Sequence, residues 1–108
     1  MSDNIIRSFL RGFDKALVIC LLEHGPRSGY SLMVELRNLT GGRIGPALIY
    51  EFLRDLENNG YLTGRVIKKG RRIREYWLTN KGRGLLRKIR ELFRTSLYDM
   101  LMEISESR

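Results

Sequence analysis

The stretch VIKKGRRIREYWLTNKG, Val66–Gly82, decides the fold. Its segment IREYWLT has the period of two that is typical of a β-strand, which places Tyr76 and Leu78 on one face and Glu75 and Trp77 on the other. The glycine-containing turn KKGRR separates this segment from an earlier run of strand-forming residues, Tyr61, Leu62, Val66 and Ile67. The stretch therefore predicts a β-hairpin with a densely basic tip.

The basic residues of the predicted hairpin have two readings. They could blunt the edge of the hairpin against association with other strands, or they could bind a polyanion. The whole chain carries 20 Lys and Arg against 12 Asp and Glu, a net charge of +8, which favours an anionic partner such as nucleic acid or an anionic membrane. The hairpin cations are Arg65, Lys68, Lys69, Arg71, Arg72 and Arg74.

Three helices are predicted ahead of the hairpin. The first covers Phe13–His24 and ends at a Gly-Pro pair. The second follows Ser28, a good N-cap residue, and the third begins at Pro46 and ends at Gly60. Their apolar residues recur at helical spacing and predict a single core. The predicted core residues are Phe13, Leu17, Leu21, Leu32, Leu36, Leu39, Ile49, Phe52, Leu53 and Leu56.

A long last helix is predicted from Asn80 to Ser105, with Thr79 as its N-cap. About 25 residues at about 1.5 Å each span nearly 40 Å, which is longer than this small domain can cover. Its apolar stripe is also broad, so pairing with a second copy of the chain is favoured over packing in the chain's own core. The expected interface residues are Ile5, Ile6, Phe9, Leu10, Leu86, Ile89, Phe93, Leu97, Met100, Leu101 and Ile104.

The order α-α-α-β-β-α defines an α+β fold that is mainly helical, a winged helix-turn-helix with a long C-terminal dimerisation helix. In this fold the third helix is the recognition helix and the hairpin is the wing. We expect residues 1–79 to form the winged-helix domain, with residues 1–12 as an N-terminal extension or helix. Residues 80–108 are expected to form the dimerisation helix.

Three fragments of the sequence resemble the PadR family of bacterial and archaeal transcriptional regulators, from about Leu10 to Leu86. LLEHGPRSGYSLMVEL looks like the junction of the family's first two helices, IYEFLRDLENNGYL is similar to its recognition helix, and GRRIREYWLTNKG matches its wing signature. The resemblance implies a homodimeric DNA-binding regulator that dimerises through its C-terminal helix. Two departures lie in the recognition helix: Ala47-Leu48 replaces the family's usual Gly-Ser pair, and Glu51 replaces its frequent proline.

The candidate DNA-binding residues come from three regions. Wing cations would contact phosphates and so position the protein without specifying sequence. In the recognition helix, Arg54 could bind guanine edges or pair with Glu51, and the resemblance implies that Tyr50 holds a phosphate. The full set is Ser28, Tyr30, Ser31, Arg43, Ala47, Tyr50, Glu51, Arg54, Arg65, Lys68, Lys69, Arg71, Arg72 and Arg74.

The favoured function is a homodimeric transcriptional regulator, a repressor, which binds a pseudo-palindromic operator in double-stranded DNA. The alternative is a winged-helix module for protein–protein interaction, which would not need phosphate-binding cations on the wing. An enzyme is not expected, because no nucleophile–base pair is recognisable. With one cysteine (Cys20) and one histidine (His24), no metal or cofactor is expected either. No signal peptide or membrane span is predicted, so we expect a cytoplasmic protein. Trp77 could line a pocket for a small-molecule effector, although packing on a neighbouring helix is favoured, and no other residue marks an effector site.

Overall fold

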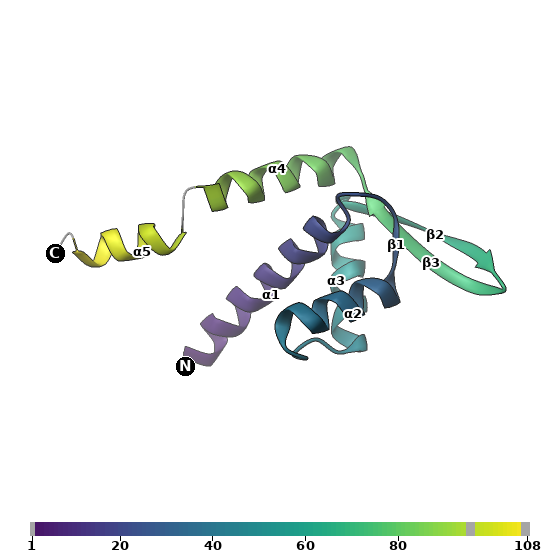
Figure 1. Ribbon diagram of the computed structural model, residues 1–108, viewed down its shortest axis with the longest axis horizontal. Helices are drawn as coiled ribbons and strands as arrows, with labels where there is room; N and C mark the ends of the chain where they lie inside the picture. The colour runs from purple at the N-terminus through teal and green to yellow at the C-terminus, as the bar shows by residue number, and fades with distance from the viewer. Residues whose placement is uncertain (1, 95–96, 107–108) are drawn as a thin grey trace.

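The computed structural model describes residues 2–94 and 97–106 of the chain. Five helices and a three-stranded antiparallel sheet follow one another as α-β-α-α-β-β-α-α (Figure 1). This is the mainly helical winged helix-turn-helix that the sequence predicts. The elements are α1 (Ser2–Leu21), β1 (Arg27–Ser28), α2 (Gly29–Thr40), α3 (Pro46–Asn58), β2 (Leu62–Lys69), β3 (Arg71–Leu78), α4 (Asn80–Arg94) and α5 (Leu97–Glu106).

Helix α1 is one continuous helix of 20 residues, so the prediction that it begins at Phe13 and ends at His24 was wrong at both ends. It stops three residues before His24 because the chain turns toward Gly25, whose φ of 143° is open to glycine and rarely adopted by other residues. Its buried apolar residues are Val18 and Ile19, whereas Phe13 is 38% exposed. The buried stripe of the helix is therefore rotated away from the one that the sequence predicts.

Helices α2 and α3 form as predicted. The backbone N–H of Ser31 donates to Ser28 Oγ at 3.0 Å, which confirms Ser28 as the N-cap of α2. The four apolar residues predicted for the core face of α3 are all buried, and Pro46 occupies its first turn. Leu39 is 58% exposed, so its assignment to the core was wrong, because α2 ends in the left-handed Gly41 just beyond it.

The sheet has the order β1-β3-β2, with β3 in the centre. The hairpin pairs Leu62 with Leu78 and Lys69 with Arg71 across a turn at Gly70, whose φ is 75°. Tyr76 and Leu78 are buried on the face that packs on the helices. The two-residue strand β1, which pairs Arg27 with Tyr76, was not predicted, because two residues are too few to show a period.

The root of the hairpin is fixed to the start of α4 by close backbone contacts. Thr79 Oγ1 accepts from the N–H of Gly82 at 3.0 Å and donates to the carbonyl of Gly60 at 2.5 Å, so Thr79 caps α4 as predicted. A Cβ at Gly82 would lie 2.1 Å from the carbonyl oxygen of Tyr61. Only glycine permits this approach, and the wing is thereby held to the helical body.

The C-terminal part differs from the single long helix that the sequence predicts. Helix α4 ends at Arg94 and a separate helix, α5, begins at Leu97, with residues 95–96 outside the described residues. Figure 1 shows that α5 projects well beyond the winged helix-turn-helix. The molecule is accordingly elongated, with extents of 61 × 30 × 23 Å. Within the described ranges, no helix is long and apolar enough to cross a membrane.

Candidate nucleic-acid interface

Tyr50 of α3 lies directly against the first turn of α2. A Cβ built on Gly29 would stand 2.7 Å from Cε1 and 3.2 Å from Oη of Tyr50, so the aromatic ring occupies the space that any other side chain would need. Tyr50 is nevertheless 44% exposed. Its hydroxyl therefore lies at the surface next to the N-terminus of α2, where the partial positive charge of a helix favours an anion.

A groove of about 370 Å³ joins this tyrosine to the wing. It brings together three segments that are far apart in the sequence: the start of α2, the exposed side of α3 and the tip of β3. Its wall holds hydroxyl groups on one side and guanidinium groups on the other, and no carboxylate. The lining residues are Ser28, Gly29, Tyr30, Tyr50, Arg71, Arg72, Ile73 and Arg74.

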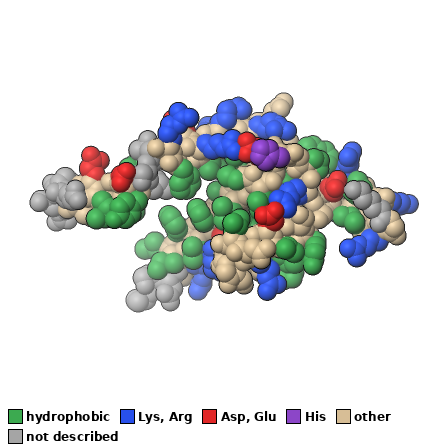
Figure 2. All heavy atoms as spheres, in the orientation of Figure 1, with side chains coloured by type: hydrophobic (Ala, Val, Ile, Leu, Met, Phe, Trp, Pro, Cys, Tyr) green, Lys and Arg blue, Asp and Glu red, His purple; other side chains and the backbone are tan. Residues whose placement is uncertain are grey.

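The cations of the wing differ in whether they contact another side chain of the protein. Lys68, Arg71 and Arg72 are exposed and form no ion pair with any described residue. Figure 2 shows Lys and Arg side chains around this end of the molecule. Arg74 instead pairs with Glu57 of α3 at 2.7 Å. The guanidinium of Arg65 lies 5.3 Å from the ring centre of Trp77. The side chain of Lys69 lies outside the described part of the wing.

Helix α3 presents Ala47, Tyr50 and Arg54 to solvent. Arg54 forms no ion pair within the described ranges, so its guanidinium is available for a ligand. Glu51, the predicted neighbour of Arg54, lies instead 3.4 Å from Arg11 of α1. The sequence could not show this pair, because its two residues are 40 positions apart.

Two predicted contact residues have partners within the protein. Arg43 donates to both carboxylate oxygens of Asp14, at 2.5 and 3.0 Å, and Asp14 is only 1% exposed. Ser31 Oγ accepts from the guanidinium of Arg27, which also pairs with Glu35 at 2.8 Å. Arg43 therefore anchors α1 to the loop before α3. The signal for this role is Asp14 itself, a carboxylate that precedes an apolar helical run and needs a partner once buried.

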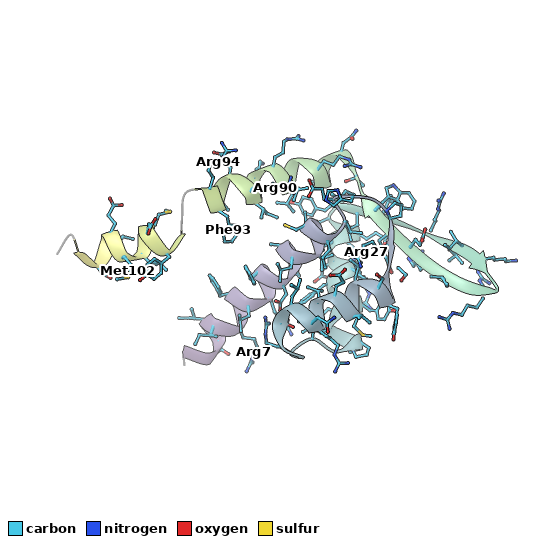
Figure 3. The ribbon with its side chains drawn as sticks, viewed as in Figure 1. Arg7, Arg27, Arg90, Phe93, Arg94 and Met102 are labelled. Atoms are coloured by element: carbon cyan, nitrogen blue, oxygen red, sulfur yellow. The ribbon has the colours of Figure 1, made fainter. Side chains whose placement is uncertain are left out.

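The apolar surface expected at a dimer interface is largely exposed. On α1, Ile5 and Phe9 are 76% and 66% exposed, and Leu101 on α5 is 66% exposed. Phe93 of α4 points toward α1 and meets Phe13 edge to face, with ring centres 6.4 Å apart (Figure 3). The other predicted residues that are exposed are Ile6, Met100 and Ile104, and Leu92, Tyr98 and Met102 are exposed apolar residues on the same two C-terminal helices.

Three predicted interface residues are placed differently. Leu86 is only 5% exposed and belongs to the core of its own chain, and Ile89 packs against that core. Both lie on the side of α4 that faces the helical body, so assigning Leu86 to a dimer interface was wrong. Leu10 is half-buried. The side chain of Leu97 lies outside the described residues.

The remaining titratable groups include one cysteine, Cys20, and one histidine, His24. No group of three His, Cys, Asp or Glu side chains in the described ranges could hold a metal ion. Cys20 is half-buried, and burial raises the pKa of its thiol above the ordinary value of 9.0, which disfavours the reactive thiolate at neutral pH. His24 is exposed beside Glu23.

The recognition helix, the wing and the groove between them define a winged helix-turn-helix protein. The chain belongs to the PadR-like family of transcriptional regulators: the family's model, described as "Transcriptional regulator PadR-like family", matches residues 18–88. The match covers the helix-turn-helix and the whole wing. It confirms the resemblance that the three sequence fragments indicate.

The chain is also similar to individual proteins. The chain is 39% identical over 70 residues to an uncharacterised 37.1 kDa protein in a transposon of Streptomyces fradiae, covering 65% of this chain and 20% of that protein. The chain thus spans about a fifth of the length of this curated relative. It is also similar to a PadR family transcriptional regulator from Eggerthella lenta, at 25% identity and a TM-score of 0.70, over 99% of this chain and 97% of that one.

A third relative was solved with DNA. The structure of Bacillus subtilis PadR in complex with operator DNA matches this chain at 26% identity and a TM-score of 0.61. The match covers 70% of this chain and 45% of that one. The shared part is thus smaller than the Bacillus protein, which has sequence beyond the region matched here.

Proposed function

We propose that this protein is a sequence-specific DNA-binding repressor that acts as a homodimer on a pseudo-palindromic operator. The observation that carries the proposal is the groove between α2, α3 and the wing. It combines a tyrosine hydroxyl at a helix N-terminus with the guanidinium groups of Arg71 and Arg72, which form no ion pair with any described residue. Such a surface fits the phosphate backbone of a duplex, which accepts hydrogen bonds and carries regularly spaced negative charge.

The groove and the exposed face of α3 would have separate roles in DNA binding. Contacts from Arg71, Arg72 and Tyr50 to phosphates would place the protein on the duplex without reading its sequence. Arg54 is then the residue to read bases, because a guanidinium can donate two hydrogen bonds to the edge of a guanine. Such a contact discriminates by about 1–3 kcal/mol against the wrong base. The similar Bacillus subtilis PadR was solved in complex with operator DNA, which supports a DNA duplex as the partner.

Dimerisation is supported by the exposed apolar side chains of α1, α4 and α5. Figure 2 shows hydrophobic side chains along the facing sides of these helices, away from the wing. A monomeric protein rarely leaves so continuous an apolar surface in water. A second copy would cover it and set two recognition helices into successive major grooves, about 34–36 Å apart. The twofold axis of the dimer would then match a pseudo-palindromic operator.

The test begins with selection of bound fragments from the source genome, followed by titration of the selected duplex. The variant R71E/R72E removes the two unpaired guanidiniums from the groove. We expect it to lose at least about 100-fold in affinity, because each dimer exchanges four phosphate-binding cations for four repelling carboxylates. Light scattering should give a mass twice the 12.6 kDa of one chain.

The matched control is R87E/R94E, which makes the same change of charge on α4. Both residues are exposed, and Figure 3 shows Arg94 on the side of α4 opposite Phe93. We expect this control to lose only a few-fold in affinity. Equal losses in the two variants would mean that net charge alone drives binding, and no loss in either would point to a protein–protein interaction module instead.

A further inference from the structure

The recognition helix α3 is acidic by its own sequence, PALIYEFLRDLEN. It carries the three carboxylates of Glu51, Asp55 and Glu57 against the single guanidinium of Arg54. A helix of this charge would be repelled from a phosphate backbone if its carboxylates were free. Because α3 is the element that must enter the groove of the duplex, its negative charge requires an explanation.

Each of these carboxylates is paired with a cation from another element. Arg11 of α1 lies 3.4 Å from Glu51. Lys15 of α1 lies 3.2 Å from Asp55. On the other side of the helix, Arg74 of β3 lies 2.7 Å from Glu57.

The two pairs between α1 and α3 repeat at the same spacing on both helices. Arg11 and Lys15 are four residues apart on α1, and Glu51 and Asp55 are four residues apart on α3, so each pair of charges follows one turn of its helix. Lys15 also lies 5.7 Å from the ring centre of Phe52, which orients its side chain along α3. The cations thus hold the carboxylates on the side of α3 that faces α1.

This arrangement leaves Arg54 without an internal partner among the described residues. Arg54 lies three residues after Glu51 on α3, a spacing at which two helical side chains can pair, so it could take Glu51 as its partner if α1 supplied no cation. Pairing the carboxylates elsewhere keeps the Arg54 guanidinium exposed for the duplex. The cations of α1 therefore set both the charge of α3 and the availability of its arginine.

We propose that Arg11 and Lys15 are positioning residues for duplex binding: they neutralise and hold the carboxylates of α3 so that this acidic helix can approach DNA. This inference rests on the proposed function. The two side chains act through Glu51 and Asp55 and need no contact with the duplex. Free Glu51 and Asp55 side chains would repel phosphates, and a free Glu51 could also pair with the guanidinium of Arg54.

The test is a double-mutant cycle on Arg11 and Glu51, read as affinity for the duplex selected from the source genome. R11Q frees the carboxylate, and we expect about a threefold to tenfold loss of affinity at low salt, which shrinks as salt rises. E51Q alone should bind at least as tightly as the unaltered protein. The double variant R11Q/E51Q should recover the affinity that R11Q loses. The cycle K15Q, D55N and K15Q/D55N should behave in the same way.

The matched control is R7Q, which removes the same charge from α1 one turn earlier. Arg7, labelled in Figure 3, forms no ion pair within the described part of the chain. R7Q should therefore change affinity by less than about twofold, since only screened long-range attraction is lost. The melting temperatures of all these variants should stay close to that of the unaltered protein, because exposed ion pairs contribute little to folding.

Several outcomes would overturn the inference. An equal loss in R11Q and R7Q would show that only net charge matters. Failure of E51Q to restore R11Q, or a loss in E51Q alone, would show that Glu51 acts directly on the duplex. These results differ from failure of the proposed function, in which the unaltered protein itself would bind no duplex from the source genome.

Discussion

At the tip of the wing, the guanidinium groups of Arg71 and Arg72 extend into solvent without an internal partner among the described residues. In the helical body, by contrast, Arg43 donates to both oxygens of a buried carboxylate, and Arg11 and Lys15 pair with carboxylates of α3. The same residue type therefore serves two purposes in one small chain. Cations of the wing remain available for a ligand, whereas those of the body organise the helix that the ligand would meet.

This contrast predicts that mutations in the two regions will affect different properties of the protein. Changes in the body and at the root of the wing should alter stability first, whereas changes at the surface of the groove should alter affinity for DNA while the fold persists.

The largest effect is expected at the root of the wing. In Gly82→Ala the new Cβ would clash with the carbonyl oxygen of Tyr61. A backbone carbonyl cannot rotate away as a side chain can, so the start of α4 must shift relative to the wing. We expect a loss of about 3 kcal/mol or more in the free energy of unfolding, measured by chemical denaturation. Gly84→Ala is the control, since its Cβ would have only the end of the Arg87 side chain nearby, at 3.7 Å.

In the control, alanine should stabilise α4 by about 0.5–1 kcal/mol, because glycine is unfavourable within a helix. Opposite signs at two glycines of the same helix would confirm the close approach at Gly82. Equal, small effects at both positions would contradict it.

The next effect concerns the buried ion pair of the body. Arg43→Met leaves the carboxylate of Asp14 buried without a partner, and we expect a loss of about 2–3 kcal/mol in stability, somewhat less than for a fully buried pair because Arg43 is 35% exposed. Arg37→Met, an exposed position on α2, should change stability by less than about 0.5 kcal/mol. A loss of DNA affinity in Arg43→Met at a temperature where it is fully folded would instead place Arg43 on the duplex.

A third prediction tests whether the Tyr50 hydroxyl must occupy its observed position in the groove. Gly29→Ala keeps the hydroxyl of Tyr50 but forces the ring to move, since Cε1 would lie 2.7 Å from the new Cβ. We expect about a tenfold loss in affinity for the duplex, comparable with Tyr50→Phe, because one charge-assisted hydrogen bond contributes roughly 1.5 kcal/mol. The melting temperature should fall only slightly. Unchanged affinity in both variants would remove Tyr50 from the proposed contacts.

The smallest effect is a dependence of stability on pH. The hydrogen bond from Arg90 of α4 lowers the pKa of Glu23 below its ordinary value of 4.5. Because the pKa is lower in the folded state, the pair stabilises the fold above about pH 4.5, and this contribution is lost as pH falls through the lower pKa of the folded protein.

Arg90→Gln tests this dependence. Its melting temperature should lie slightly below that of the unaltered protein at pH 7. The two melting temperatures should converge at acidic pH, where Glu23 is protonated. A constant difference across the whole pH range would show that Arg90 acts through packing and not through the charge of Glu23.

The sequence predicts those features that depend on local spacing. The caps at Ser28 and Thr79, the buried face of α3 and the shared face of Tyr76 and Leu78 on β3 all follow from periods and turn residues within short windows. The dense charge of the wing is likewise visible in the sequence, because five cations surround Gly70.

The sequence does not predict partners that the fold brings together from far apart. The pairs Asp14–Arg43 and Arg11–Glu51 join residues 29 and 40 positions apart, so they depend on how α1 crosses the other helices. The packing of Gly29 on Tyr50 has the same origin. That α4 ends at Arg94 and α5 begins at Leu97 was not predicted for a different reason: the apolar residues of the two helices keep a helical spacing, and this spacing alone does not show where a helix ends.

The central claim is that unpaired wing cations bind phosphates in a dimer. The most direct measurement is the dependence of duplex affinity on salt concentration for the unaltered protein and for R71Q/R72Q. If six phosphates are neutralised per dimer, the slope of log K against log salt should be about −5. Neutralising four of the six cations should flatten it by about 3.5. Equal slopes for the two proteins would contradict the claim.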